Sequence, residues 1–200
     1  AGLALAVHFA GWIWSLEYTS VAVSTLLVST TPIWTALYDS LVHKRRLSAT
    51  AWAALAAGIV GLVLVIGFST TRAPVPGYEV LGAALALAGG IAFAAYFLLV
   101  RDVRDAYGTR AIVTRTYTWA AIVLVIAAAA SRQSPPPLTN GPAWGGILAM
   151  ALVSQLLGHT ALNAALRWFS ASAVALTTLL EPVTAAILAL LIFGENLAPS

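Results

Sequence analysis

The sequence contains no cysteine and few charged residues: only 8% of its 200 positions are Asp, Glu, Lys or Arg. The absence of cysteine excludes a disulfide framework and thiolate metal sites, and it leaves the redox compartment undecided. A soluble domain carries roughly 25% charged residues, so the low charge excludes a soluble enzyme domain, a disordered chain and a coiled coil. Hydrophobic residues make up 60% of the chain and the mean hydropathy is +0.91, so most side chains face something other than water.

Sequence motifs of catalysis and nucleotide binding are also missing. The chain has no His-Glu-x-x-His zinc motif, no Gly-x-Ser-x-Gly nucleophile elbow and no glycine-rich phosphate loop. We therefore expect no enzyme, no cofactor, no metal site and no transport driven by nucleotide hydrolysis. The ten Lys and Arg residues are spread over short loops instead of forming one patch, which argues against nucleic-acid binding.

Seven apolar stretches are long enough to cross a bilayer, which requires roughly 20 apolar residues per helix. They lie at residues 1–18, 21–42, 49–68, 80–100, 111–130, 143–166 and 173–193. Two pairs of stretches are joined almost without a loop, through residues 19–20 and 169–170. The sequence therefore predicts an all-α polytopic membrane protein with seven transmembrane helices.

The distribution of Lys and Arg indicates the orientation of these helices, because cytoplasmic loops carry an excess of positive charge. One face collects eight of the ten cations: Lys44, Arg45, Arg46, Arg101, Arg104, Arg110, Arg115 and Arg167. The opposite face has only Arg72 and Arg132. We expect loops 43–48 and 101–110 to be cytoplasmic. Abundant Ala and nine Arg against one Lys point to a GC-rich bacterial genome, and hence to the inner membrane.

The chain repeats weakly on itself at an offset of 150 positions. Residues 16–48 align with residues 166–198, with seven identities in 33 positions, and Pro32 falls on Pro182. The aligned helices are five spans apart, so they cross the membrane in opposite directions. This pattern predicts an inverted-topology repeat, which is typical of secondary transporters. It also predicts ten helices in the intact protein, two of them before this chain and one after it.

Around the two prolines the sequence resembles EamA-type members of the drug/metabolite transporter superfamily. The resemblance lies in residues 16–48 of the first half and in the second half from Glu181-Pro182 to Gly194-Glu195. The first half departs from the family at Lys44-Arg45, where a Gly-Glu pair is usual. The resemblance implies two inverted five-helix repeats. Residues 1–70 would form the last three helices of the first repeat, and residues 78–200 the first four of the second. It also implies a central cavity and transport, often export, of small metabolites such as amino acids.

Three polar residues are spaced four apart in the stretch 143–166: Gln155, His159 and Asn163. This spacing places them on nearly one face of a helix. Polar groups at membrane depth are costly and tend to be functional, so we expect this face to contact a solute. The alternative is that these side chains join packed helices through hydrogen bonds.

Glu181 lies near the middle of the stretch 173–193, with Thr177 on the same side of the helix. Pro182 cannot donate a hydrogen bond to the carbonyl of Thr178, which leaves that carbonyl free. The acid could therefore bind a cationic or amine group, or take up a proton as coupling ion. The alternative is a protonated Glu181 that bonds to a neighbouring helix and holds the kink. We expect Pro182 and its counterpart Pro32 to be kink or gating positions.

His8 lies in the middle of the first stretch, one helical turn before Trp12. The register of the repeat places His8 beside His159, and two such imidazoles could bound a cavity or relay protons. A hydrogen bond between helices is the alternative. Tyr96, together with Tyr117 and Trp119, is either an aromatic wall of the cavity or an ordinary packing residue.

Two further features concern packing and charge. Small residues four apart, at Ala57 with Gly61 and at Gly82, Ala86 and Gly90, allow helices to approach closely. Packing within one subunit is the main interpretation, and the surface of a homodimer is the alternative. Asp39 is expected to pair with Lys44 or Arg45, at the predicted cytoplasmic end of its helix.

Together these features predict a secondary transporter of small metabolites, amino acids or related compounds, which exports them by alternating access around a mid-membrane cavity. Its partners would be a small-molecule solute, the lipid bilayer and a coupling proton. The alternative is a non-catalytic membrane subunit or assembly protein, against which the inverted repeat argues.

Overall fold

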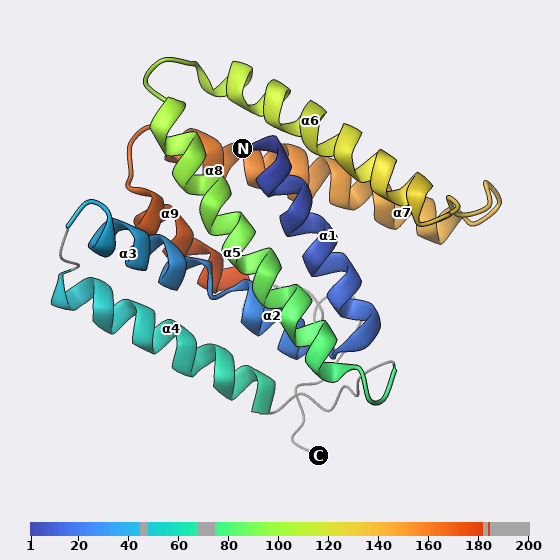
Figure 1. The fold of residues 1–200 in the computed structure, drawn as a ribbon, viewed down its shortest axis with the longest axis horizontal. Helices are drawn as coiled ribbons and strands as arrows, with labels where there is room; N and C mark the ends of the chain where they lie inside the picture. The colour runs from blue at the N-terminus through green and yellow to red at the C-terminus, as the bar shows by residue number, and fades with distance from the viewer. Residues whose placement is uncertain (45–47, 68–74, 182–183, 185–200) are drawn as a thin grey trace.

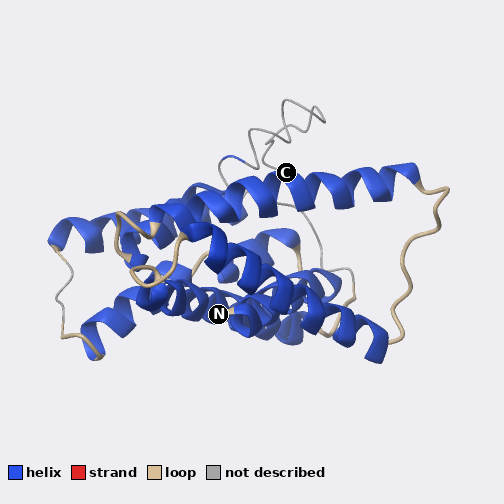
Figure 2. Cartoon of the chain, turned by 90° about the horizontal axis from the view of Figure 1, so that it is seen from above, coloured by secondary structure: helices blue, strands red, loops and turns tan. Residues whose placement is uncertain are grey.

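The computed structural model describes residues 1–44, 48–67, 75–181 and 184, and its regular structure there is entirely helical (Figures 1 and 2). The α-helices are α1 (Gly2–Tyr18), α2 (Val21–Val28), α3 (Thr31–Leu41), α4 (Ala49–Gly67), α5 (Glu79–Val103), α6 (Thr109–Ala130), α7 (Gly141–Ala149), α8 (Thr160–Ala165) and α9 (Ala171–Thr177). A π-helical segment, Met150–His159, joins α7 to α8, and a 3₁₀ turn, Thr178–Leu180, follows α9.

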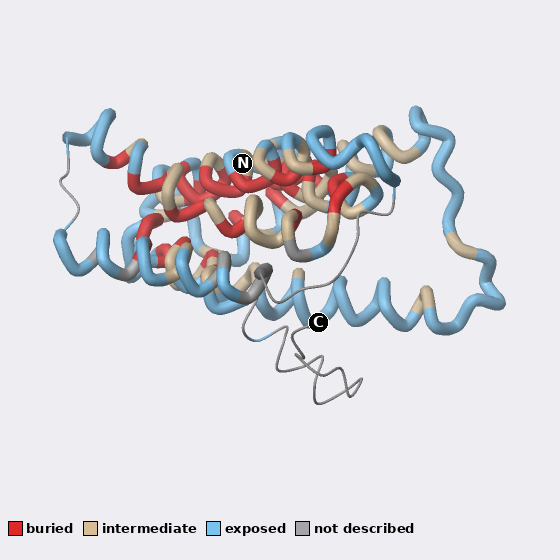
Figure 3. The backbone as a smooth tube through the Cα atoms, turned by 90° about the horizontal axis from the view of Figure 1, so that it is seen from below, coloured by how far each residue is buried: buried red, intermediate tan, exposed pale blue. Residues whose placement is uncertain are grey.

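The centre of the molecule is the pair α1 and α5, which make the most extensive contact in the fold. Helix α6 packs on α1, whereas α2, α3 and α9 pack along α5. Figure 3 shows that the buried stretches of the chain gather in this middle region. Large side chains fill it without exposure to solvent, among them Leu5, Tyr96, Phe97, Val100 and Leu166.

Within the described residues, three helical stretches are long and apolar enough to cross a membrane: Glu79–Val103, Thr109–Ala130 and Gly141–Ala165. The last of them runs through α7, the π-helical segment and α8. The most apolar part of this stretch buries none of its residues in the protein. Apolar side chains that a protein leaves unburied are suited to a lipid environment. The predicted count of seven spans remains a prediction.

The predicted single helix at residues 21–42 is wrong in detail, because the structure divides it into α2 and α3 at Ser29 and Thr30. Pro32 has no N–H and leaves the carbonyl of Val28 without its usual helical donor. The hydroxyl of Thr31 donates to that carbonyl at 2.8 Å and lies 3.1 Å from the carbonyl of Gly90 on α5. The break is therefore stabilised from within the chain and held against α5.

The two nearly loopless junctions have the same local chemistry. Ser20 caps α2 by accepting a hydrogen bond from the backbone N–H of Val23 at 3.2 Å. Ser170 caps α9 by accepting one from the N–H of Ala173 at 3.1 Å. A serine at this position satisfies a backbone donor that the first helical turn leaves free. Both serines occupy equivalent places at the offset of 150 positions.

The glycines of α5 allow the close helix packing that their spacing predicts. A Cβ atom at Gly90 would lie 2.8 Å from the carbonyl oxygen of Leu27, and one at Gly82 would lie 2.7 Å from the backbone nitrogen of Thr19. These contacts are with backbone atoms of the same chain, so packing within one subunit is confirmed for this stripe. A Cβ atom at Gly61 on α4, by contrast, would meet nothing within 4 Å.

Candidate functional site

A cavity of about 1070 Å³ lies between α1, α2, α6, the π-helical segment and the 3₁₀ turn after α9. Its walls are mostly apolar, with hydroxyl, amide, imidazole and carboxyl groups at separate points. Ligand sites in proteins typically combine an apolar surface with a few polar groups that fix orientation. The volume and this mixture suit an organic solute of metabolite size.

Six of the predicted site residues line this cavity. They are His8, Trp12, Gln155, His159, Thr177 and Glu181. They come from α1, the π-helical segment, α9 and the position after the 3₁₀ turn, so segments far apart in the sequence meet there. The π-helical segment supplies both Gln155 and His159, and π-helical turns occur frequently at functional sites.

Two predicted site residues lie outside the cavity. The buried hydroxyl of Tyr96 donates to Oδ1 of Asn163 at 2.8 Å, and Nδ2 of Asn163 donates to the backbone carbonyl of His159 at 2.7 Å. The first bond joins α5 to α8, which is the interhelical role that the sequence leaves open for Asn163, and the second lies within one helical stretch. The placement gives no support to solute contact by either side chain.

The two predicted kink positions have different outcomes. Pro32 is buried at the start of α3 and lines a second, smaller cavity of about 110 Å³. Its kink is present, since α2 ends shortly before it. Pro182 lies outside the described residues.

The imidazole rings of His8 and His159 lie beside each other on the cavity wall, with centroids 6.1 Å apart, as the repeat register predicts. Nδ1 of His8 lies 3.1 Å from the carbonyl oxygen of Gly89. Because a carbonyl only accepts, that nitrogen must carry the proton, which fixes the orientation of the ring. Phe93 stacks on His8 at 4.2 Å and approaches His159 at 5.2 Å.

Two polar atoms on the cavity wall are buried without a hydrogen-bond partner in the described part of the chain. They are Oε1 of Gln155 and Nδ1 of His159. Buried polar groups in native proteins nearly always have a partner, and leaving one without costs about 1–3 kcal/mol. Both side chains line the cavity but these atoms have almost no exposed surface, so a solute would reach them only after the side chains turn toward the cavity.

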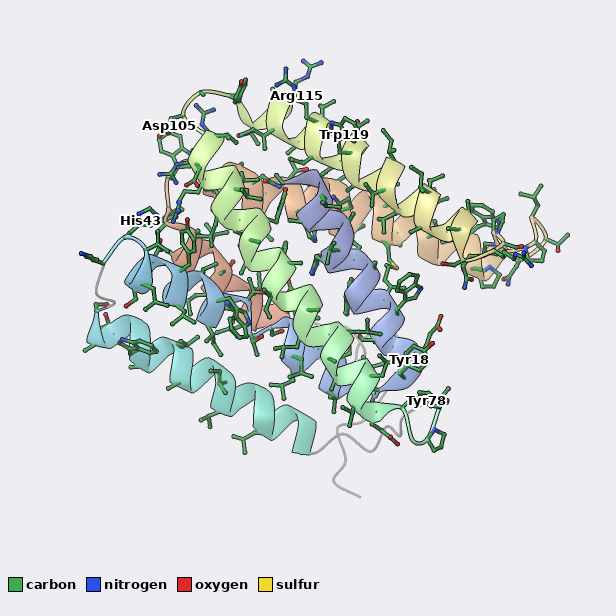
Figure 4. All side chains as sticks on the ribbon, viewed as in Figure 1. Tyr18, His43, Tyr78, Asp105, Arg115 and Trp119 are labelled. Carbon is green, nitrogen blue, oxygen red and sulfur yellow. The ribbon has the colours of Figure 1, made fainter. Side chains whose placement is uncertain are left out.

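Several cavity residues were not predicted from the sequence, notably Phe9, Phe93 and Ser154. Apolar aromatic residues in apolar helices carry no signal that separates a cavity wall from ordinary packing. Tyr117, one of three aromatic candidates, lines the cavity, and its hydroxyl lies 3.3 Å from that of Thr160. Trp119 on α6 instead is 62% exposed and does not line the cavity (Figure 4).

A network of charged and polar groups lies beyond the cavity, near the C-terminal end of α5. Arg101 forms an ion pair with Asp39 on α3 at 2.7 Å, and Ser172 on α9 donates to the same carboxylate at 3.1 Å. The predicted pairing of Asp39 with Lys44 or Arg45 is wrong for Lys44, which is exposed, and Arg45 lies outside the described residues. Arg101 takes the place predicted for Lys44, because α3 and α5 pack side by side.

Arg104 adds a second tie at the same end, because its guanidinium donates to the backbone carbonyls of Leu166 and Phe169. Figure 4 shows His43 and Asp105 at this end of α5, and Tyr18 and Tyr78 at the opposite end. The rings of Tyr18 and Tyr78 lie 6.0 Å apart. We use the name "Arg101 network" for Asp39, Arg101 and Ser172 together.

The chemistry of the site is that of binding. Among the described residues, no three His, Asp or Glu side chains gather as a metal ion would require. The cavity combines hydrogen-bonding groups, aromatic faces and one carboxyl group, all set in an apolar wall.

Curated proteins similar to this chain are bacterial and are named as transporters. An uncharacterized transporter of Clostridium kluyveri is 19% identical over 98% of this chain and 63% of its own length. The uncharacterized transporters YwfM and YyaM of Bacillus subtilis are 26% and 28% identical, over 93% and 86% of this chain. The chain spans 61% and 57% of those two proteins.

A solved crystal structure has a similar fold over 98% of this chain and 67% of its own, with a TM-score of 0.79 and 16% sequence identity. The EamA-like transporter family matches residues 1–67 and residues 80–200. That family consists of membrane transporters and not of enzymes. Because these two matches cover nearly the whole sequence, the chain belongs to the EamA-like transporter family.

Proposed function

We propose that this chain forms part of a secondary transporter that exports small metabolites, amino acids or related compounds, by alternating access around the central cavity. The observation that carries this proposal is the cavity of about 1070 Å³, with polar atoms on Gln155 and His159 that have no hydrogen-bond partner among the described residues. Its walls come from both parts of the chain that match the family. A solute bound there would lie between the two halves.

An inverted repeat of two five-helix units is the architecture that we propose for the whole protein. The division of the family match into residues 1–67 and 80–200 supports units at 1–70 and 78–200. The serine caps at Ser20 and Ser170, 150 positions apart, support the same register. So does the interruption of the α-helix shortly before each aligned proline position. Such repeats commonly underlie alternating access.

Alternating access also requires that the cavity be closed toward one side at a time. Arg101 lies eight residues beyond the cavity residue Phe93 on α5, or roughly 12 Å along the helix. The Arg101 network ties α3, α5 and α9 together at that level. We propose that it closes the cavity toward this end and opens when the transporter changes state.

The end that carries the Arg101 network is proposed to be cytoplasmic. The excess of Lys and Arg in loops 43–48 and 101–110 supports this orientation. The bacterial origin of the relatives supports the inner membrane as its location. Export, like the substrate class, rests on the resemblance to the family.

Proton coupling and a homodimer are finer parts of the same proposal. Glu181 is the one carboxyl group on the described cavity wall, which makes it the candidate proton acceptor. If its charge or proton is needed, Glu181→Gln abolishes transport, and wild-type flux in this variant would exclude coupling through Glu181. A homodimer is compatible with the exposed position of Gly61 on α4, where an added Cβ would meet nothing within 4 Å.

Transport is tested with the full-length protein in liposomes loaded with labelled amino acids and related metabolites. We expect selective efflux of one compound class, and weaker efflux from the variant Gln155→Ala/His159→Ala because the cavity loses both polar groups. Tyr96→Phe is the matched control, since it removes a polar group just outside the cavity. Undiminished efflux from a folded double variant would favour the competing interpretation, a non-catalytic membrane subunit, or a route other than this cavity.

A further inference from the structure

The described wall of the cavity has a one-sided charge pattern. Glu181 supplies its one acidic side chain, and no Lys or Arg lines that part of the wall, although the chain contains ten. Arg101, which lies outside the cavity lining, is already paired with Asp39. A solute carboxylate that moves from water into the cavity would meet no positive side chain on the described wall. It would therefore lose several kcal/mol of solvation free energy. An anionic or zwitterionic solute would therefore bring at least one unpaired charge.

The polar atoms on the cavity wall that lack a partner in the described part of the chain favour a solute that donates hydrogen bonds. Oε1 of Gln155 can only accept, and Nδ1 of His159 accepts when the other ring nitrogen carries the proton. The carboxylate of Glu181 also only accepts. An ammonium group has three donors and no acceptor, so it matches this set of atoms better than a carboxylate or a carbonyl does.

The remainder of the wall suits an apolar body with a cationic head. Phe9 and Phe93 lie 5.4 Å and 5.2 Å from the ring of His159, next to one of the unpartnered atoms. Trp12 and Tyr117 add two further aromatic rings to the lining. Aromatic faces attract cations, and the attraction is stronger where water is excluded. They also pack well against ring-sized apolar groups.

We propose that the cavity selects monocationic organic amines: molecules with one ammonium group, an apolar ring-sized body and no free carboxylate. Glu181 is the counter-charge, Gln155 and His159 accept hydrogen bonds from the ammonium, and the aromatic wall holds the apolar body. This inference rests on the proposed function, because it assumes that the cavity is the solute site of a transporter. It narrows the substrate class from amino acids to amines or esters related to them.

Four probes that share one phenylethyl body separate charge from shape. Phenethylamine and N-methylphenethylamine are cations, phenylalanine is a zwitterion, and 3-phenylpropionate is an anion. Binding is measured by isothermal titration calorimetry on the full-length protein in detergent. We expect the two cations to bind at least about tenfold more tightly than phenylalanine, and 3-phenylpropionate to bind most weakly. Equal or tighter binding of phenylalanine or 3-phenylpropionate would overturn the inference, as would failure of all four to bind.

A pair of charge-removing variants tests the assigned counter-charge. Glu181→Gln should weaken phenethylamine binding by about tenfold or more, because the ammonium loses its charged partner in the cavity. Glu17→Gln removes the same charge from the exposed end of α1, outside the cavity, and should leave binding unchanged. Unchanged amine binding in a folded Glu181→Gln variant would overturn the assignment. The four-probe series on the unmodified protein decides the amine class even where that variant does not fold.

Flux measurements with the same probes separate this inference from the proposed function. Amine binding without flux of any solute would contradict transport while supporting the amine site. Flux that prefers phenylalanine over phenethylamine would leave transport intact and overturn the amine inference. Flux that prefers phenethylamine supports both.

Discussion

Substitution of Asp39 by Asn tests whether the Arg101 network closes the cavity. The side chains of Asp39 and Arg101 are 8% and 11% exposed, and their charged atoms lie 2.7 Å apart. Removing one partner of a buried ion pair costs about 3–5 kcal/mol, because the other charge remains buried. Asp102 lies 3.1 Å from Arg101 but is 54% exposed, so it compensates only in part. We therefore expect Asp39→Asn to destabilise the closed arrangement by about 3 kcal/mol.

This free energy has a large effect on a two-state equilibrium. Because each 1.4 kcal/mol changes an equilibrium constant about tenfold, the ratio of open to closed cavities at this end should rise by about a hundredfold. The reporter is a cysteine at Ser154, which is exposed and lines the cavity. A membrane-impermeant maleimide added from the side of Arg101 should label it much faster in the Asp39→Asn background.

Asp102→Asn is the matched control, because it removes the same charge from the exposed partner of Arg101. Exposed ion pairs contribute about 0–1 kcal/mol, so this variant should change the labelling rate little. An unchanged rate in Asp39→Asn, or an equal increase in both variants, would refute closure by the Arg101 network.

Three further predictions concern packing and caps. Gly90→Ala should destabilise the protein by about 1–3 kcal/mol, because the new Cβ would lie 2.8 Å from a backbone oxygen. Gly61→Ala should leave stability unchanged, because its new Cβ would meet nothing within 4 Å. Equal melting temperatures of the two variants would contradict this prediction. Ser20→Ala should cost about 1 kcal/mol in thermal unfolding, because α2 loses its cap; an unchanged melting temperature would show that the cap contributes nothing. Tyr96→Phe should lower the free energy of unfolding by about 1–3 kcal/mol, because Oδ1 of Asn163 loses its hydrogen-bond donor. The affinity for solute should not change. A loss of affinity would instead place Tyr96 at the solute.

The helices were predictable where the signal is local. Expected stretches at 80–100 and 111–130 correspond to Glu79–Val103 and Thr109–Ala130, because continuous apolar sequence specifies a helix in lipid. The position of the break between α2 and α3 could be predicted from the sequence, but the contact that stabilises it could not. Pro32 marks its place, but the hydroxyl of Thr31 that stabilises the break also contacts α5, and that contact depends on tertiary packing.

The site was predictable where the repeat register or helical spacing supplies a neighbour. The register places His8 beside His159, and the structure has their rings 6.1 Å apart. Helical spacing shows which residues share a face but not what that face meets. Asn163 follows His159 by one turn, yet it meets Tyr96 instead of the cavity.

Long-range pairing left no trace in the sequence. Arg101 and Asp39 are 62 positions apart, and nothing in either neighbourhood selects one for the other. Nearby Lys44 and Arg45 were the obvious local partners of Asp39, but Arg101 pairs with it because α5 packs against α3. The sequence around Phe93 likewise does not show that this apolar residue lines the cavity, because its place there depends on the position of α5 in the fold.

Transport through the cavity is tested most directly by blocking it covalently in the full-length protein. A cysteine is introduced at Ser154 on the cavity wall, or as a control at Ser134 in the exposed segment between α6 and α7. Solute efflux from liposomes is then measured before and after complete reaction with a bulky maleimide. The proposed function predicts that modification at position 154 abolishes efflux and that modification at position 134 leaves it unchanged. Full efflux after complete modification at position 154 would contradict transport through this cavity.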